Sequence, residues 1–276
     1  MTHASEIASG QRFGFGANWQ AFAGRLDSDR ILEAEASLKT MLGLESLAGL
    51  RFLDIGSGSG LFSLAAHRLG AEVYSFDYDP NSVACTQSLR DGYGNATPPW
   101  KVEEGSVLDD DYLKKLGRFD IVYSWGVLHH TGSMWLAIEN AAQRVTPNGR
   151  LFIAIYNDQG RASQAWLGVK QAYNRLPPSL RWLVLWPAFL RLWGPTTLRD
   201  LLSGRPGCTW REFKRQRGMD PWRDVVDWVG GYPFEVATPE AIFEFCKARG
   251  FRLDKLKTCA GGHGCNEFVF MLAPAT

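Results

Sequence analysis

The chain has 276 residues, with 30 basic and 29 acidic side chains, 45% hydrophobic residues and five cysteines. This length allows one large domain with an insertion or two smaller ones, and either can bury a substantial core. No run approaches the roughly 18 apolar residues of a membrane span. A net charge of +1 gives no general electrostatic basis for binding nucleic acid. Composition therefore excludes disordered and membrane-spanning classes, and we expect no nucleic-acid partner.

The cysteines and the first residues bear on the cellular compartment. The cysteines are odd in number and scattered along the chain. The N-terminus lacks the basic start, the apolar run and the cleavage site of a signal peptide. We therefore expect a reduced, cytoplasmic protein, while the oligomeric state is not indicated by the sequence.

The first expected elements are a loose segment, Phe13–Trp19, and a helix over residues 28–42. From residue 50, short apolar runs alternate with helical stretches, which is typical of a parallel sheet with crossover helices. The expected strands are residues 51–55, 72–77, 101–104, 119–125 and 151–156, and the expected helices are residues 61–69, 80–89 and 133–145, the last closed by a turn at residues 147–149.

The C-terminal residues complete this pattern. Thr238, Pro239 and Glu240 form a helix start, and the helix is expected to run to Arg249. Strands over residues 251–258 and 266–272 follow, joined by a glycine-rich turn at residues 261–264. The sequence thus predicts an α/β fold with a doubly wound, mostly parallel seven-stranded sheet that includes one antiparallel strand.

The segment from residue 157 to residue 236 has a different composition. It carries 12 basic and 7 acidic side chains, and it holds seven of the eleven tryptophans. We interpret it as a helical insertion between the fifth strand and the last helix. The predicted organisation is an N-terminal lid and helix (1–49), a sheet-containing core (50–156), the Trp-rich insertion (157–236), and a closing helix and hairpin that complete the core (237–276).

The most informative stretch lies between the first strand and the first helix of the core. Gly56, Gly58 and Gly60 alternate there, and glycines let a ligand approach the backbone and the helix N-terminus closely. Asp77 ends the next strand 21 positions after Gly56, the spacing at which a carboxylate can accept ribose hydroxyls. The dinucleotide fingerprint requires a third glycine at position 61, where Leu61 stands, so a nicotinamide oxidoreductase is the less favoured alternative.

An acidic residue, Asp54, followed by alternate glycines resembles the first motif of class I S-adenosylmethionine-dependent methyltransferases. The resemblance continues through residues 75–80, 105–107, 127–130 and 147–149, and the final hairpin matches the reversed seventh strand of that Rossmann-like fold. It covers roughly residues 27–156 and 238–272, and is closest to small-molecule enzymes of the ubiquinone and menaquinone type.

The resemblance implies a set of cofactor contacts. The glycine turn would hold the methionine part, Asp54 its amino group, Asp77 the ribose, and Tyr78 and Val107 the adenine. Ser106 stands where the family often has an acidic residue, and Asp109 is a substitute for that contact. The expected cofactor-binding residues are Asp54, Gly56, Ser57, Gly58, Gly60, Asp77, Tyr78, Ser106, Val107, Asp109 and Trp125.

Methyl transfer from S-adenosylmethionine to a hydroxyl or an amine needs a base for the acceptor proton. His129 and His130 follow the fourth strand at the ligand-binding edge of the sheet, and one of them is the candidate base, whereas helix capping and solvation are the structural alternatives. The aromatic face of Trp125 is placed to attract the sulfonium, with core packing as the alternative. Residues 124–127 lack the Asn/Asp-Pro-Pro-aromatic motif of enzymes that methylate bases or glutamine.

Two further positions are candidate substrate contacts. Trp19 lies in the N-terminal segment that we expect to fold over the cofactor as a lid, and His263 lies in the turn before the last strand. Cys259, His263 and Cys265 offer zinc-type ligands, but their spacing matches no common zinc motif. We therefore expect no metal site.

The insertion admits three interpretations. Its Trp and Arg content suits a lid over an anionic or aromatic acceptor. Residues 182–190, flanked by Arg181 and Arg191, alternatively lie on a membrane surface or receive a lipid tail. A buried helix pair interrupted by Pro187 is the plain structural interpretation.

The sequence thus predicts a methyltransferase that transfers a methyl group from S-adenosyl-L-methionine to an oxygen or nitrogen of a small-molecule acceptor, leaving S-adenosyl-L-homocysteine. Two alternatives remain. One is methylation of a lipid-linked or macromolecular acceptor, and the other is a protein that binds the cofactor without turnover.

Overall fold

The structure is a computed structural model that describes residues 3–16, 19, 27–95, 97–217 and 221–274, without the side chains of residues 214–217. Ala17 and Asn18 of the expected N-terminal lid therefore lie outside the described residues. The chain forms two compact units. We call residues 16–159 and 235–276 the sheet unit, and residues 1–15 and 160–234 the helical unit.

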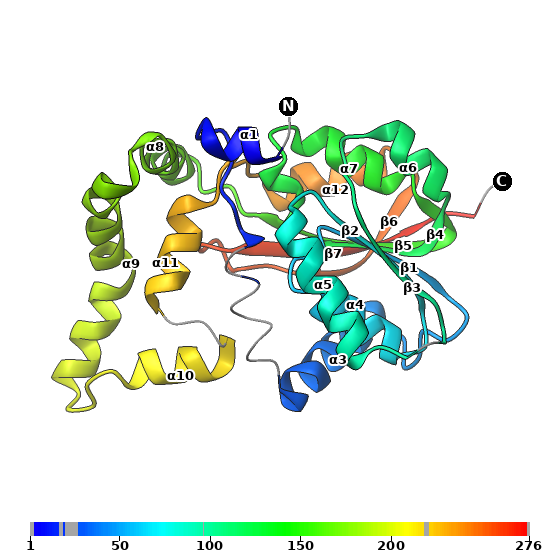
Figure 1. Ribbon diagram of the computed structural model, residues 1–276, viewed down its shortest axis with the longest axis horizontal. Coiled ribbons are helices and arrows are strands. Elements are labelled where there is room, and N and C mark those ends of the chain that lie inside the picture. The colour runs from blue at the N-terminus through cyan, green and yellow to red at the C-terminus, as the bar shows by residue number, and fades with distance from the viewer. Residues whose placement is uncertain (1–2, 17–18, 20–26, 96, 218–220, 275–276) are drawn as a thin grey trace. The chain divides into compact units, whose positions relative to one another are not determined.

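One seven-stranded sheet runs through the sheet unit, in the order β3-β2-β1-β4-β5-β7-β6 (Figure 1). Strand β7 is antiparallel to both of its neighbours, and the pairs among β1 to β5 are parallel. The predicted doubly wound, mostly parallel α/β fold is therefore confirmed. The strands are β1 (Arg51–Ile55), β2 (Glu72–Asp77), β3 (Trp100–Glu104), β4 (Phe119–Trp125), β5 (Val145–Tyr156), β6 (Phe251–Lys257) and β7 (Cys265–Leu272).

Helices cover both faces of this sheet (Figure 1). One apolar cluster joins the sheet to α3 (Ser28–Leu42), α4 (Leu61–Arg68) and α5 (Pro80–Tyr93). The other joins it to α6 (Asp110–Leu116), α7 (Met134–Ala142) and α12 (Pro239–Lys247). Alternate residues of each inner strand enter opposite clusters, because successive side chains of a strand point to opposite faces.

Local capping explains where several of these helices begin. Asp27 accepts a hydrogen bond from the amide of Arg30 at the start of α3. Thr238 does the same for Ala241, and Pro239 occupies the first turn of α12, where a missing N–H costs nothing. The predicted start of the last helix is therefore the observed one.

The end of α7 differs from the expectation. The helix stops at Ala142 and β5 already begins at Val145, so the predicted turn at residues 147–149 lies within the strand. Asn148 has φ +63°, and the pairing of β4 with β5 shifts between Phe119 and Ile121. A left-handed residue lets extra chain bulge out of the ladder without ending it. The turn residues were recognised, but they form an irregularity of a long strand.

The helical unit consists of α1 (His3–Ala8), α8 (Arg161–Arg175), η2 (Pro178–Leu180), α9 (Trp182–Leu202), α10 (Cys208–Arg217) and α11 (Pro221–Gly230). Its core comprises Tyr173, Leu185, Ala188, Trp193, Val225 and Val229, with partly buried aromatic rings around them. Several ring pairs meet edge to face, for example Trp193 with Phe213 at 4.8 Å between centroids. The unit is thus held largely by aromatic packing.

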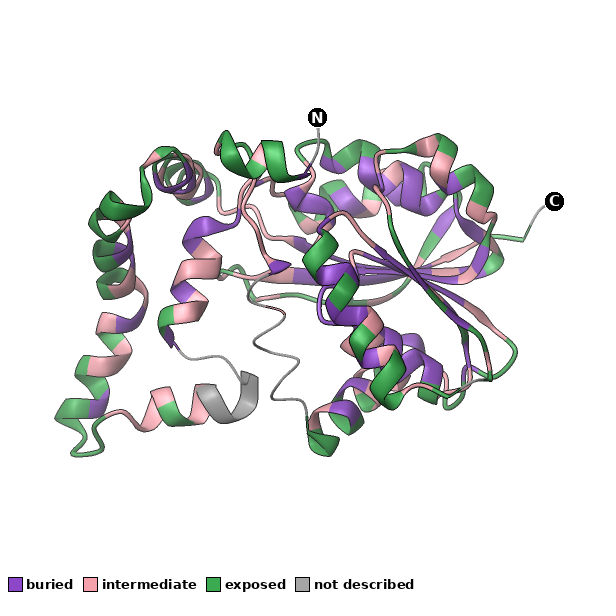
Figure 2. Ribbon diagram, in the orientation of Figure 1, coloured by how far each residue is buried: buried purple, intermediate pink, exposed green. Residues whose placement is uncertain are grey.

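Helix α9 continues through Pro187 and Pro195, and its burial differs from the expectation. Leu185 and Ala188 are buried, but Trp182, Trp186 and Leu190 are exposed, so the interpretation of residues 182–190 as a buried helix pair holds for only one side of the helix. Figure 2 shows exposed positions along α9. Hydrophobic periodicity cannot distinguish a face that packs on the core from a face that points outward. Among the described residues, no helix is long and apolar enough to cross a membrane.

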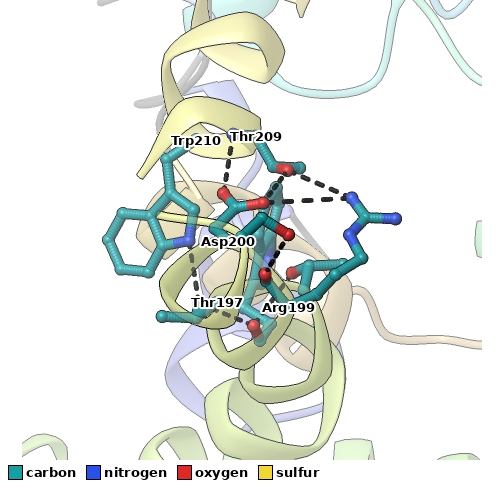
Figure 3. A network of polar contacts seen from close by, with 8 residues as sticks. Thr197, Arg199, Asp200, Thr209 and Trp210 are labelled. Carbon is teal, nitrogen blue, oxygen red and sulfur yellow. Dashed lines mark hydrogen bonds and ion pairs between the residues drawn. The ribbon is translucent and has the colours of Figure 1, made fainter. Parts of the chain in front are cut away.

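Two ionisable side chains, Asp200 and Lys170, are buried in the helical unit. Asp200 accepts hydrogen bonds from the amide and the hydroxyl of Thr209, at 2.8 and 2.7 Å, so it joins α9 to α10 (Figure 3). Both hydrogen bonds lower the pKa of Asp200, and the bond from the amide of Thr209 has the larger effect. Lys170 on α8 is fully buried, and its ammonium donates to the carbonyl of Trp228 and faces the rings of Trp228 and Phe234.

Candidate functional site

The glycine turn between β1 and α4 has the backbone geometry that only glycine adopts readily. Gly56, Gly58 and Gly60 have φ values of +77°, +55° and +80°. The amides of Gly56 and Ser57 donate to the carbonyl of Phe76, at 2.8 and 3.2 Å, which ties the turn to β2. An L side chain in this left-handed region is strained, so the alternation of glycines follows from the path of the chain.

Space is also restricted at the first glycine. A Cβ at Gly56 would lie 2.4 Å from Cγ1 of Val127. Val127 immediately precedes the short helix η1 (Leu128–His130) that carries both candidate histidines. The glycine therefore allows the loop after β4 to approach the turn after β1. Because β1 and β4 are parallel neighbours, their carboxyl ends meet at one edge of the sheet.

Asp77 at the end of β2 binds the turn directly. One carboxylate oxygen accepts the amide of Gly58 at 2.9 Å, and the other accepts the amide of Asp79 at 2.9 Å. Loss of solvent raises the pKa of Asp77 to about 6, because burial penalises the charged form more than these two hydrogen bonds favour it. The structure thus brings Asp77 and the glycine turn together.

Asp54 on β1 is 2% exposed and lies at the same edge. Burial raises its pKa to about 7, opposed by the hydrogen bond that it accepts from the hydroxyl of Ser63. Ser63 also contacts the hydroxyl of Ser75 at 2.7 Å, and the indole of Trp100 donates to Ser75 at 2.9 Å. This chain of hydrogen bonds was missed by sequence reasoning, because serines within a helix and a strand carry no pattern that marks them as partners of a carboxylate.

The residues expected near adenine are placed as follows. Tyr78 is partly buried after β2, and Val107 is buried, with its carbonyl accepting the side-chain amide of Asn140. The hydroxyl of Ser106 accepts the amide of Leu108.

Asp109 caps a helix. Its carboxylate accepts the amide of Tyr112 at 2.9 Å at the start of α6. Sequence reasoning did not anticipate α6 and hence did not anticipate this capping bond.

Trp19 lies against the glycine turn. A Cβ at Gly58 would be 3.2 Å from the indole Cε2 and Nε1, and the carbonyl of Trp19 accepts the thiol of Cys85. Gly16, three positions earlier in the chain, donates its backbone amide to the carboxylate of Asp79 at 2.8 Å. The structure therefore places Trp19 beside the turn expected to bind the cofactor, whereas the sequence suggested a contact with substrate.

The two histidines lie in η1 at the carboxyl end of β4, and both are buried. Nδ1 of His129 accepts the amide of Tyr156 at 3.3 Å, and the two rings are 3.9 Å apart between centroids. The ring of His130 is 4.5 Å from that of His129 and 5.3 Å from that of Tyr156. An Nδ1 that accepts an N–H carries no proton, which fixes the neutral tautomer of His129 with its proton on Nε2.

Glu235 is a residue of this region that the sequence did not reveal. Its carboxylate accepts the amide of Met134 at 2.9 Å, and its own amide donates to the carbonyl of His129 at 3.0 Å. Burial raises the pKa of Glu235. It thus anchors the histidine loop from about a hundred positions away in the chain, and no local signal indicates such a contact.

Trp125 and His263 are exposed at the same edge of the sheet. Trp125 ends β4, and His263 lies in the connection between β6 and β7, next to the start of β7 that pairs with the end of β5. Asn266 holds this connection. Its side-chain NH2 group donates to the side-chain oxygen of Asn157 at 3.0 Å, and its side-chain oxygen accepts the backbone amide of Cys259 at 3.1 Å.

The geometry defines a class of protein first. A glycine turn after β1, an acidic residue at the end of β2 and a reversed β7 between β5 and β6 in an open sheet are typical of a nucleoside-binding α/β protein. The family model described as a methyltransferase domain matches residues 26–204. The chain therefore belongs to the methyltransferase domain family, and it is a member of the class I S-adenosylmethionine-dependent methyltransferases, as the motifs predicted.

Relatives support the same assignment. The chain is 30% identical over 171 residues to a ubiquinone biosynthesis O-methyltransferase of Caulobacter sp. (strain K31), covering 59% of this chain and 62% of that protein. It is 28% identical over 183 residues to the protein of that name in Azorhizobium caulinodans, covering 65% and 66%. The chain thus spans less than two thirds of the length of these two relatives.

Solved structures share the fold at low identity. The magnesium protoporphyrin IX methyltransferase of Synechocystis PCC 6803 superposes with a TM-score of 0.52 at 14% identity, covering 88% of this chain and 83% of the other. An O-methyltransferase family protein from Burkholderia thailandensis gives 0.54 at 13% identity, covering 89% and 58%. These likenesses concern the fold.

Proposed function

We propose that the protein transfers a methyl group from S-adenosylmethionine to an oxygen of a small-molecule acceptor. The observation that carries this proposal is the pair of carboxylates at the glycine turn. Burial raises the pKa of both Asp54 and Asp77. Among the described residues, no basic side chain pairs with either of them. A cationic ligand would supply the missing positive charge.

The residues present fit S-adenosylmethionine, which when bound supplies a methyl group on a positively charged sulfonium. The glycine turn, Gly56 to Gly60 with Ser57, would hold the methionine part, and Asp54 would bind its ammonium. Asp77 would exchange the amide of Gly58 for the ribose hydroxyls. Tyr78, Ser106 and Val107 would border the adenine. The exposed ring of Trp125 lies at the edge where the sulfonium is expected.

For the proton of the acceptor, we assign the base to His130 and a positioning role to His129. The lone pair on Nδ1 of His129 is engaged by the amide of Tyr156, so this ring cannot accept a proton there without losing a hydrogen bond. The ring of His130 packs against that of His129 and has greater access to solvent, at 8% exposed. An imidazole suits proton removal near neutral pH.

An oxygen acceptor is favoured over nitrogen because the similar relatives are named O-methyltransferases. We further propose a cytoplasmic setting, supported by the odd number and the scattered positions of the five cysteines. His263, exposed beside the same edge, remains a candidate contact for the acceptor.

Binding of S-adenosylhomocysteine, measured by titration calorimetry with NAD and NADP as controls, tests the cofactor. We expect binding of S-adenosylhomocysteine alone. We also expect its affinity to rise with pH through about 7, because the ligand ammonium requires ionised Asp54. If S-adenosylhomocysteine binds at no pH, the proposal is wrong. Binding of NAD would favour the oxidoreductase alternative instead.

The base is tested with His130→Asn and His129→Asn against a panel of phenols and alcohols. We expect His130→Asn to keep the affinity for S-adenosylhomocysteine and to lose about 10²–10⁴-fold in kcat. His129→Asn should change KM and stability more than the pH profile of kcat. Full activity of His130→Asn would show that His130 is not the base. A wild-type protein that binds the cofactor but methylates no acceptor would favour a non-catalytic role.

A further inference from the structure

Helix α9 carries an unusual number of exposed apolar side chains for one helix. Seven of its 21 residues are large hydrophobics between 48% and 81% exposed: Trp182, Leu183, Trp186, Leu190, Leu198, Leu201 and Leu202. Figure 2 shows this exposure along α9. Single exposed hydrophobics are ordinary, but a contiguous set on one element marks a contact surface.

The first half of the helix has a defined apolar face. Trp182, Leu183, Trp186 and Leu190 follow the spacing that puts side chains on one side of a helix, and we call these four residues the Trp-Leu face. Leu185 and Ala188, between them in sequence, belong to the buried core of the helical unit. One side of the helix therefore packs on the core of the helical unit, and the Trp-Leu face is a second apolar side that is exposed.

Charge distinguishes among the partners that could cover this face. From residue 181 to residue 205 the chain has four arginines, Arg181, Arg191, Arg199 and Arg205, and one acidic residue, Asp200. Asp200 is 2% exposed and is occupied by Thr209, as Figure 3 shows. Neither Arg191 nor Arg205 is in an ion pair within the described part of the chain, and both are exposed. The charge that α9 presents outward is positive.

From this combination we infer that α9 lies on an anionic lipid bilayer, with the Trp-Leu face in the interface between headgroups and acyl chains and the arginines at the level of the headgroups. Tryptophan has an apolar ring and an N–H donor, which suits this boundary, and arginine is attracted to anionic headgroups. A second copy of the chain fits less well, because both sides of a contact between two copies of α9 would carry the same positive charge. The inference is independent of the methyl-transfer chemistry.

Flotation of the full-length protein with phosphatidylcholine vesicles, with and without phosphatidylglycerol, tests the inference. We expect at least about tenfold stronger binding to the vesicles with phosphatidylglycerol, weakened as salt is added. Equal binding to both vesicles, or binding to neither, would overturn the inference.

A pair of double variants separates this face from general hydrophobicity. Leu183→Gln with Leu190→Gln should weaken binding to anionic vesicles by about tenfold or more. Leu32→Gln with Leu256→Gln removes two leucines of comparable exposure from the sheet unit, 54% and 45%, and should bind as wild type. Both double variants should keep the wild-type affinity for S-adenosylhomocysteine, which shows that they fold. Equal losses in the two double variants would contradict the assignment to α9.

Two further measurements identify the contact itself. Brominated acyl chains quench nearby indoles, and we expect quenching that falls when Trp182 and Trp186 are both replaced by phenylalanine. Arg191→Gln should lower the affinity for anionic vesicles about fivefold and reduce its salt dependence. Sedimentation that reveals a dimer abolished by the Leu183→Gln, Leu190→Gln variant, with no quenching by lipid, would assign the face to a second copy and overturn the bilayer inference.

Discussion

The sheet unit and the helical unit bury ionisable side chains in different ways. In the sheet unit, Asp54 and Asp77 lie at the carboxyl edge of the strands, beside glycine amides. In the helical unit, Lys170 and Asp200 lie between helices and are matched by backbone groups, rings and a threonine. Asp54 and Asp77 lie beside a glycine turn whose backbone a ligand can approach, and among the described residues no basic side chain pairs with them, which favours a binding role. Lys170 and Asp200 lie between packed helices, which favours a structural role.

The two units also differ in their surfaces. Exposed large hydrophobics of the sheet unit are scattered over several elements, such as Leu32 on α3 and Leu256 on β6. In the helical unit they gather on α9. This comparison indicates that the sheet unit recognises a small polar ligand through its edge, while the helical unit offers an extended contact face.

The largest expected effect comes from filling the glycine turn. Gly56→Ala should reduce the affinity for S-adenosylhomocysteine about a hundredfold, because its methyl group would displace Val127 and the histidine loop. Part of any loss of stability, about 1–2 kcal/mol, comes from the left-handed backbone alone. Calorimetry and thermal unfolding measure the two effects.

Gly117→Ala is the matched control for this variant. Gly117 has φ +80°, and a Cβ there would meet no atom within 4 Å. It should also lose stability from its backbone, because an L side chain is strained at this positive φ, and it should keep full affinity. If Gly56→Ala binds as well as Gly117→Ala does, the close approach of the two loops has no role in the site.

Lys170→Met is expected to change how stability depends on pH. Burial lowers the pKa of Lys170 from 10.5 to about 7. The unfolded chain therefore binds a proton that the folded chain lacks between these values, so wild-type stability should rise with pH there by up to about 1.4 kcal/mol per pH unit from this group. The variant should lack this slope and be more stable at pH 7. Urea unfolding at a series of pH values measures it.

Lys101→Met, at an exposed position of β3, controls for the removal of one lysine. It should keep the wild-type slope. A wild-type stability that does not change between pH 7 and 10 in this comparison would show that Lys170 is fully compensated by the carbonyl of Trp228 and the two rings.

A smaller effect is expected from Ser63→Ala. Loss of its hydrogen bond should raise the pKa of Asp54 further and lower the affinity for S-adenosylhomocysteine at neutral pH about tenfold, since a hydrogen bond to a charged group contributes about 1.5–3 kcal/mol and about 1.4 kcal/mol is tenfold. The readout is the midpoint of the pH profile of binding, which should shift upward. Ser88→Ala, on the exposed side of α5, should leave this midpoint unchanged. A drop in affinity that is the same at every pH would mean that Ser63 acts on packing and not on Asp54.

Much of the sheet unit followed from the sequence. Apolar strands, helix starts at Ser28 and Thr238, and the reversed last strand are local or periodic signals, and the structure has them where they were expected. The end of α7 was placed incorrectly because turn-forming residues at 147–149 bulge out of β5 instead of preceding it. Turn chemistry describes the local backbone and does not decide whether the ladder continues beyond it.

By itself, the sequence determined the fold class, the glycine turn with Asp77 and the family, because these depend on the spacing of residues close together in the chain. Only the tertiary structure decided that the amide of Gly58 meets Asp77, that Ser63 holds Asp54, and that Glu235 anchors the loop of His129. It also decided that the Trp-Leu face of α9 is exposed. Helical periodicity gives the same pattern for a face that packs inward and a face that points outward, and only the packing of the other helices distinguishes them.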